Sequence, residues 1–210
     1  MHSRSSRGSP CPFKAQAAAE PNLHLGYRTQ VQAKRFPPFG YPLSRQHRHA
    51  IYSLDRDSSW LLVAGKQGML SIFSYPQLLA ASAADEHTIT PALTTKLHKR
   101  WISRARLVSL DDHSLVVSAA DDGLLTLSSL SDTQGQPRLT PLERHAAPHT
   151  GGIFGMDLWQ NSKVATASKD GTVALWQLAP TKAACVHHFA DLSTSVLKTV
   201  AYVHACNVVV

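Results

Sequence analysis

Between residues 43 and 210, short apolar runs alternate with polar residues and are separated by turn-forming residues. The alternation is clearest in three places, at Leu70 and Ile72, Leu125 and Leu127, and Val173 and Leu175. Alternate residues of an extended strand lie on one face of a sheet, so each pair predicts a strand with one buried face. No stretch sustains the i, i+3, i+4, i+7 spacing of an amphipathic helix, and the pattern therefore predicts an all-β fold.

The strands belong to a repeated unit. His47, His98 and His149 are equally spaced, and each precedes two β-like runs that end at a glycine: Gly68, Gly123 and Gly171. We expect a hairpin turn at each glycine. Asp-Gly is a favoured two-residue hairpin turn because both positions tolerate a positive φ, and it follows the second β-like run of the second and third units. Gln67–Gly68 is a weaker version of the same turn.

A fourth strand is predicted just before each successive histidine position, within residues 91–97, 137–143 and 183–189. Four short strands in a unit of about 40 to 50 residues are typical of a β-propeller blade. We expect blades near 47–75, 98–130 and 149–178, and a truncated one at 193–210. Closed propellers have about 4 to 8 blades, so the sequence predicts an incomplete β-propeller and a fragment of a longer protein.

Two segments exceed this plan. Residues 76–90 are expected to carry a short helix, and residues 131–141, which are rich in Ser, Thr, Gly and Pro, are expected to form a surface loop.

The third unit carries a recognisable motif, HTGGIFGMDL…KVATASKDGTVALWQL, at residues 149–178. It resembles the repeat of the WD-repeat β-propeller family. The resemblance implies a hydrogen-bonded chain in which Asp170 accepts from the His149 ring, the ring bonds a strand hydroxyl, and the hydroxyl meets the Trp176 indole. Thr166 or Ser168 would supply that hydroxyl. Such pairing matters because an unpaired buried polar group costs about 1–3 kcal/mol.

The resemblance covers residues 43–210 unevenly. In the third unit, Pro148 replaces the family's glycine and Gln177 replaces its aspartate. In the first two units the tryptophan position holds Phe73 and Ser128, and in the fourth Ser193 takes the place of the histidine.

The charge of the chain is unevenly distributed. Lys and Arg number 21 against 14 Asp and Glu, which gives +7. The excess lies in the first fifty residues, so residues 1–42 are expected to form a disordered basic arm rich in Pro, Ser and Arg. A solubilising extension, an organelle transit peptide and a nuclear or nucleic-acid-binding tail are the alternatives for this arm. Widely spaced Cys11, Cys185 and Cys206 form no disulfide framework, which favours a cytoplasmic or nuclear location.

A basic run without acidic residues crosses the start of the second unit. It is a candidate contact patch for an acidic peptide, a phosphate or a nucleic-acid backbone, and its members are Lys96, Lys99, Arg100, Trp101, Arg104 and Arg106. The plainer interpretation is that these cations pair in part with the nearby Asp121 and Asp122.

The sequence shows no chemistry that competes with binding. Twelve histidines invite a metal interpretation, but no ligand spacing supports one, and there is no GxSxG turn, phosphate loop or carboxylate pair. We therefore expect no metal, no cofactor and no catalytic residue. The predicted function is a non-catalytic protein–protein interaction scaffold whose partners are other proteins or peptides. The alternative is a nucleic-acid- or ribonucleoprotein-associated factor that uses the basic arm and the 96–106 patch. No membrane partner is expected.

Overall fold

The computed structural model describes residues 50–83, 90–145, 148–190, 192–203 and 208–209. The chain divides into residues 1–39 and 40–210, and all described ranges lie in the second unit. The basic arm expected at residues 1–42 lies outside the described residues, as does His47.

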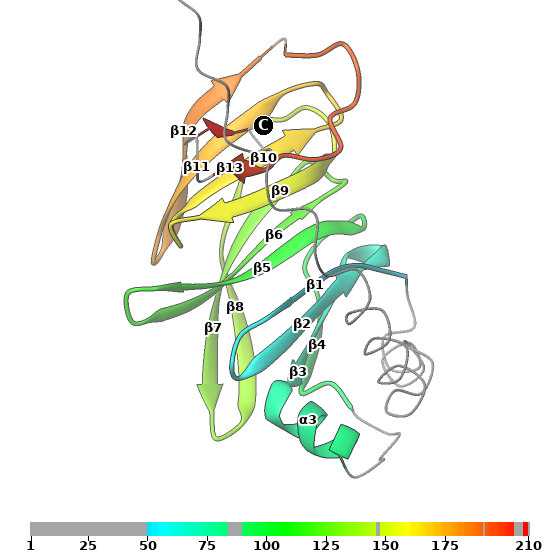
Figure 1. Ribbon diagram of the computed structural model, residues 1–210, viewed down its shortest axis with the longest axis vertical. Coiled ribbons are helices and arrows are strands. Elements are labelled where there is room, and N and C mark those ends of the chain that lie inside the picture. The colour runs from blue at the N-terminus through cyan, green and yellow to red at the C-terminus, as the bar shows by residue number, and fades with distance from the viewer. Residues whose placement is uncertain (1–49, 84–89, 146–147, 191, 204–207, 210) are drawn as a thin grey trace, which may run out of the picture. The chain divides into compact units, whose positions relative to one another are not determined.

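Three four-stranded antiparallel sheets follow one another along the chain, each in sequential strand order (Figure 1). The first contains β1 (Ile51–Arg56), β2 (Trp60–Gly65), β3 (Met69–Ser74) and β4 (Leu93–Lys96). The second contains β5 (Ile102–Leu110), β6 (His113–Ala120), β7 (Leu125–Thr133) and β8 (Gln136–His145). The third contains β9 (Ile153–Trp159), β10 (Lys163–Ser168), β11 (Val173–Ala179) and β12 (Lys182–Phe189). This arrangement confirms the expected all-β, incomplete propeller.

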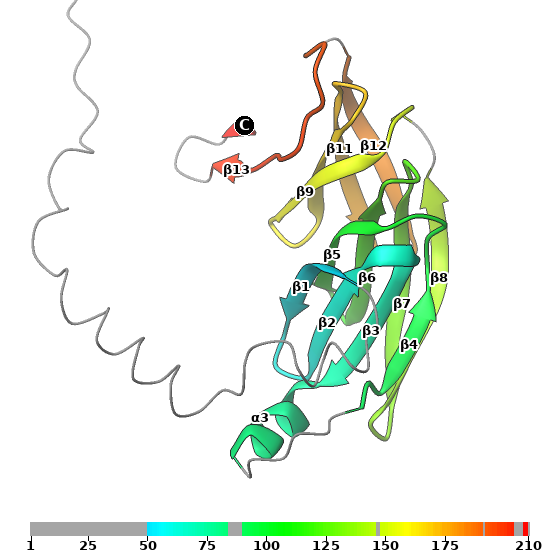
Figure 2. The same ribbon diagram turned by 90° about the vertical axis from the view of Figure 1, so that its right-hand side faces the viewer.

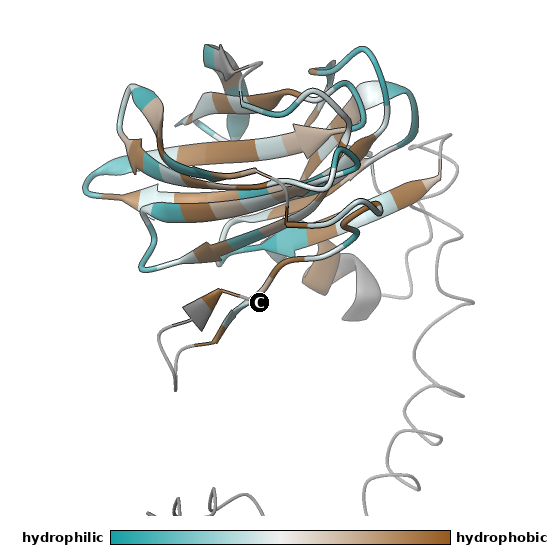
Figure 3. Cartoon of the chain, turned by 90° about the horizontal axis from the view of Figure 1, so that it is seen from above, coloured by the Kyte–Doolittle hydropathy of each residue, from teal (hydrophilic) through white to brown (hydrophobic). Residues whose placement is uncertain are grey.

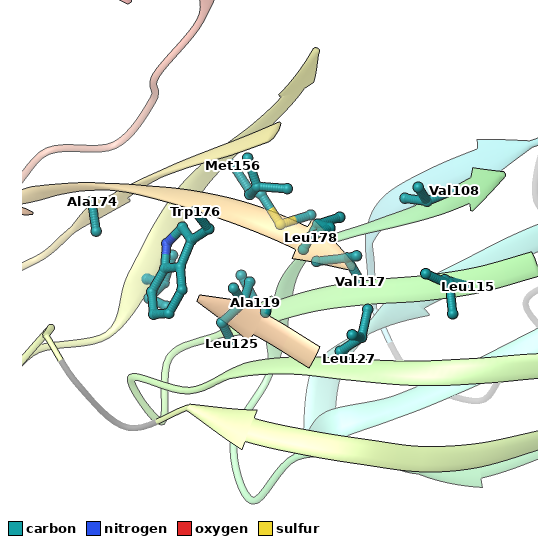
Figure 4. Close-up of a cluster of buried hydrophobic side chains, with 13 residues drawn as sticks. Val108, Leu115, Val117, Ala119, Leu125, Leu127, Met156, Ala174, Trp176 and Leu178 are labelled. Carbon is teal, nitrogen blue, oxygen red and sulfur yellow. The ribbon is translucent and has the colours of Figure 1, made fainter. Parts of the chain in front are cut away.

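The second sheet packs against both of its neighbours, because its strands bury side chains on both faces. Leu115, Val117 and Leu127 join Trp176 and Leu178 of the third sheet in one core (Figure 4). Residues of opposite parity, among them Val116 and Ala120, join the first sheet in a second core whose other members include Trp60, Leu62, Leu70 and Ile72. The strict alternation along each strand thus builds two inter-sheet cores, while hydrophilic residues gather in the connecting loops (Figure 3).

A fourth, two-stranded sheet pairs β13 (Tyr202–Val203) with β14 (Val208–Val209). Its segment packs on the free face of the third sheet, where Val200 joins Trp159 and Ala165 in a small core. The Tyr202 ring stacks on the Trp159 ring with 4.8 Å between centroids. These contacts place residues 192–203 and 208–209 on the side of the third sheet where the next blade of a propeller would lie.

The hairpin turns at Gly123 and Gly171 differ from the expected two-residue type. Each glycine N–H donates to the carbonyl three residues earlier, at Ala120 and Ser168, and only the glycine has a positive φ, +78° and +82°. These are three-residue loops in which a type I turn is followed by a glycine bulge. The first blade differs again, because Gln67 and Gly68 both have a positive φ, 63° and 74°.

The two extra segments have different outcomes. Residues 75–83 form the short helix α3 (Tyr75–Ala83) at the end of the first sheet, in agreement with the expectation for residues 76–90 (Figure 2). The surface loop expected at residues 131–141 is wrong. There β7 and β8 continue to a tight turn at Gln134 and Gly135, whose φ values are 56° and 78°. Pro137 and Pro141 hide this strand in the sequence, yet both lie in β8, an outermost strand of its sheet, where proline is tolerated.

Candidate functional site

A continuous chain of hydrogen bonds runs through the third blade. His149 lies in the turn that leads into β9, and its Nε2 is 2.7 Å from Thr166 Oγ1 on β10. The Trp176 indole on β11 donates to the same oxygen over 2.9 Å. On the other side of the ring, His149 Nδ1 is 2.8 Å from Thr172 Oγ1, and Thr172 donates to the Asp170 carboxylate over 2.6 Å. These hydrogen bonds connect four segments of the blade: the lead-in turn, β10, β11 and the turn that holds Asp170.

The two ends of the chain fix its direction. The Asp170 carboxylate only accepts, so Thr172 donates to it and Nδ1–H donates to Thr172. In the neutral ring Nε2 then accepts from the Thr166 hydroxyl, whose oxygen accepts from the indole. These bonds place the proton of the neutral ring on Nδ1. Burial lowers the pKa of His149 from 6.5 to about 4, with the nearby His188 acting in the same direction and Asp170 against it.

Asp170 is the anchor of the turn. Burial alone would raise its pKa, but the Thr172 hydroxyl and the backbone N–H groups of Thr150 and Gly151 donate to the carboxylate and hold the pKa well below its usual range. The structure places Asp170 Oδ1 3.8 Å from His149 Nδ1, which is beyond a hydrogen bond. The two groups are bridged by Thr172.

Of the two candidate hydroxyls, Thr166 occupies the bridging position and Ser168 does not. Ser168 Oγ donates to the carbonyl of Gly152 and accepts from the backbone N–H of Asp170, so it closes the hairpin. Sequence reasoning missed Thr172. Its signal is a hydroxyl directly after the turn glycine, a position that holds Leu124 in the second blade and Met69 in the first.

The second blade has a shorter version of the network. His98 Nδ1 lies 3.1 Å from Asp122 Oδ1, and its Nε2 lies 2.9 Å from Ser118 Oγ. Burial raises the pKa of Asp122, but the His98 hydrogen bond and charge interaction, with two backbone N–H donors, lower it overall. Ser128 stands at the tryptophan position, and its hydroxyl and that of Thr126 are buried without a hydrogen-bond partner in the described part of the chain. The first blade replaces the network with apolar Val63 and Phe73, both fully buried.

The basic run separates into two groups. Lys96, Lys99 and Arg100 are exposed, and Arg100 pairs with Asp121 over 2.9 Å. Arg104 and Arg106 lie along β5, and each donates Nη1–H to a neighbouring carbonyl oxygen of that strand, at Ser103 and Ala105.

Arg106 also occupies a special register position. In the first and third blades the equivalent residue is an aspartate whose carboxylate accepts a backbone N–H of the next blade, from Asp55 to Leu107 and from Asp157 to Tyr202, each over 2.8 Å. The joint between the second and third blades therefore has an arginine where the other two have a carboxylate.

Trp101 belongs to a row of aromatic rings that the sequence did not predict. Its ring stacks on Phe154 of β9, with centroids 5.1 Å apart at 26°, and is tilted against Tyr52 of β1 at 5.2 Å. The row joins β1, the residue just before β5, and β9. Tyr52 is 46% exposed, and Trp101 and Phe154 are half-buried.

We call the surface that carries this row the hairpin face. It consists of the turns Lys66–Gly68, 121–123 and 169–171, the lead-in turns 98–101 and 149–152, and the rings of Tyr52 and Phe154 that contact Trp101. These segments touch: the Asp121 N–H donates to the Trp101 carbonyl, and Lys169 N–H donates to the Gly152 carbonyl. A depression of about 430 Å³ lies among them, lined by Arg100, Asp121, Asp122, Thr150, Gly151, Gly152, Lys169 and Asp170.

Comparison with known proteins agrees with this architecture. Residues 140–177 match the WD40 family, described as WD domain, G-beta repeat. Residues 140–177 thus match a WD40 repeat, and the three four-stranded antiparallel sheets, with the histidine–hydroxyl–tryptophan network of the third, are consistent with WD-type blades. The crystal structure of the computationally designed Ika4 protein has a similar fold, with a TM-score of 0.50 and 18% identity over 74% of this chain and 81% of that chain. No curated protein matches the sequence.

Within the described ranges, no three His, Cys, Asp or Glu side chains are grouped as metal ligands would be. The same ranges contain no helix with the length and hydrophobicity of a membrane span.

Proposed function

We propose that this protein is a non-catalytic scaffold that binds another protein or a peptide on the hairpin face. Members of the WD40 family bind other proteins in general and are generally non-catalytic. The observation that carries the proposal is the aromatic row, because three half-exposed rings held by rigid strands are the kind of anchor that interfaces use.

The titratable groups nearby support binding in preference to catalysis. His98 and His149 are buried, and each ring uses both nitrogens in hydrogen bonds within its blade. Asp122 and Asp170 are likewise engaged by backbone donors from their own turns and from the neighbouring lead-in turns. A general base must reach a substrate proton, and groups already committed to the fold are poorly placed to do so.

A crosslinking experiment tests the proposed face. A photo-reactive phenylalanine analogue is placed at Tyr52 or Phe154 in the full chain, and at Gln160, an exposed turn residue at the other end of the third blade, as the control. We expect one partner protein to be crosslinked from Tyr52 and Phe154 and not from Gln160, and to persist after nuclease treatment. Equal crosslinking from all three positions would contradict a binding role for this face.

The nucleic-acid alternative predicts a different result. Crosslinked material would then be nuclease-sensitive, and capture would fall steeply as salt is raised, because phosphate contacts release counterions. The cytoplasmic or nuclear location remains part of the proposal, and a fluorescent fusion of the full chain tests it. Import into another organelle would support the transit-peptide interpretation of residues 1–42.

A further inference from the structure

We infer that the hairpin face between the second and third blades binds an acidic linear peptide carrying an aliphatic or aromatic anchor residue. This inference rests on the proposed function and adds the chemistry of the partner. It comes from three features of the described residues: the placement of the cations, the internal use of the carboxylates and the adjacent aromatic row.

The cations stand outward around the depression. Arg100 and Lys169 line it from the second and third blades, and the Arg100 side chain is 65% exposed. Lys99 is exposed beside Arg100, and Lys66 is exposed in the neighbouring turn of the first blade. That turn touches the same segment, because Gly68 packs against the carbonyl groups of His98 and Arg100. Four cations therefore come from three adjoining turns.

The three aspartates that line the depression are largely covered by their own hydrogen-bond partners. The side chains of Asp121, Asp122 and Asp170 are only 14%, 8% and 12% exposed. Asp121 is held by Arg100, and the other two accept hydrogen bonds from the backbone N–H groups of their own and neighbouring turns. A ligand that approaches the face meets the cations first. Its carboxylates can come closer to these cations than to the covered aspartates, so attraction outweighs repulsion.

The aromatic row supplies the apolar part of the site. Trp101 directly follows Arg100 in the sequence, so the aromatic row begins next to the cations that surround the depression. A hydrophobic side chain on the rings, flanked by acidic residues over Lys99, Arg100 and Lys169, would use both parts together.

Charge count favours a peptide over a nucleic acid. A nucleic-acid backbone presents a continuous row of phosphates and needs a matching row of unopposed cations. Here four cations overlie three carboxylates, so a ligand with a few separated negative charges is the better match.

The test uses fluorescence anisotropy with the full 210-residue chain. The probe is a fluorescein-labelled peptide Asp-Glu-Leu-Asp-Glu-Phe, compared with Lys-Lys-Leu-Lys-Lys-Phe and with labelled oligothymidylate. The double variant Lys99→Glu/Lys169→Glu reverses two exposed charges, and Lys163→Glu/Lys182→Glu reverses two at the opposite end of the third blade. We expect the acidic peptide to bind best, and its affinity to fall about tenfold or more only in the first double variant.

Equal effects of the two double variants, or preferential binding of the basic peptide or the oligonucleotide, would overturn the inference. Circular dichroism of both variants checks that the fold is intact. If Tyr52 and Phe154 still crosslink a partner protein while the acidic peptide does not bind, the inference fails and the proposed function stands. If they crosslink no protein, the proposed function fails even where the acidic peptide binds.

Discussion

At the scale of single residues, two buried threonines in neighbouring blades show opposite uses of the same side chain. Thr166 accepts from the Trp176 indole and bonds the His149 ring, so its hydroxyl is fully employed. Thr126 lies on β7, equally buried, and its hydroxyl has no partner in the described part of the chain. A hydroxyl removed from water without a partner is unfavourable, whereas a bridging one stabilises several segments.

This contrast gives a matched pair of substitutions. Thr166→Val keeps the shape but removes the hydrogen bonds that the Thr166 hydroxyl makes with the His149 ring and the Trp176 indole, so the free energy of unfolding should fall by about 2–4 kcal/mol. Thr126→Val should raise it by about 1 kcal/mol, because the unpaired hydroxyl is removed. Urea unfolding followed by tryptophan fluorescence measures both changes. Two losses of similar size would contradict the assigned network.

The sequence predicted this network in part. Resemblance to the family identified His149, Asp170 and Trp176, because residue identity at fixed spacing is visible in the chain. It could not choose between Thr166 and Ser168, since both lie on one face of the same strand, and strand pairing and turn geometry decide which one reaches the ring. Thr172 was missed because its role depends on a rotamer next to a turn.

At the scale of elements, the hairpins depend on glycines in different surroundings. Gly171 and Gly135 have similar backbone conformations, with φ of +82° and +78°. A Cβ at Gly171 would collide with the Ser193 carbonyl, whereas a Cβ at Gly135 would have nothing within 4 Å. The third-blade turn therefore needs glycine for two reasons, and the turn between β7 and β8 needs it for one.

Alanine substitution separates these reasons. Gly135→Ala should lower the free energy of unfolding by about 1 kcal/mol, the cost of a left-handed conformation for a residue with a Cβ. Gly171→Ala should lower it by about 3 kcal/mol or more, since the lead-in to the next segment must also move. Thermal unfolding by circular dichroism checks the order. A Gly135→Ala variant as unstable as Gly171→Ala would be inconsistent with the open space around Gly135.

Strands were more predictable than their connections. The apolar alternation after Gly68, Gly123 and Gly171 arises because every second side chain is buried between sheets. This pattern is visible in the sequence of one chain. The long hairpin of β7 and β8 was not visible, because exposed polar residues and prolines on an outer strand resemble a loop. The aromatic row was also hidden, since Tyr52, Trp101 and Phe154 are distant in sequence and meet only when the blades pack.

At the scale of the molecule, the blades share hydrophobic cores, and the buried titratable groups within them make the stability of the fold depend on pH. Burial keeps His149 neutral down to about pH 4 in the folded chain, while an unfolded histidine takes up a proton near pH 6.5. Between these values the unfolded state binds more protons, so stability falls as the pH is lowered. Asp170 and Asp122 have lowered pKa values, so their stabilisation is present above the usual aspartate pKa and is lost at still lower pH.

The free energy of unfolding should therefore fall by about 2–4 kcal/mol between about pH 7 and about pH 4 because of His149. His149→Gln cannot titrate in this range, and its amide can still accept from Thr166 and donate to Thr172. Its pH profile should be flatter than that of the parent. Urea unfolding at a series of pH values measures both slopes, and parallel profiles would show that His149 is not the group responsible.

The one-way order of hydrogen bonds in the third blade also bears on how such repeats change through evolution. The direction of the chain is set by an obligate donor, Trp176, and an obligate acceptor, Asp170, while the members between them follow. Where the tryptophan is missing, the strand hydroxyl no longer accepts from an indole. In the second blade Ser128 stands at the tryptophan position, and the Ser118 hydroxyl bonds His98. Across homologous blades, a tryptophan should therefore occur only together with a strand hydroxyl, whereas the hydroxyl can occur without the tryptophan, as Ser118 does in the second blade. An alignment of blades would then record the polarity of the network as a correlated pair of positions.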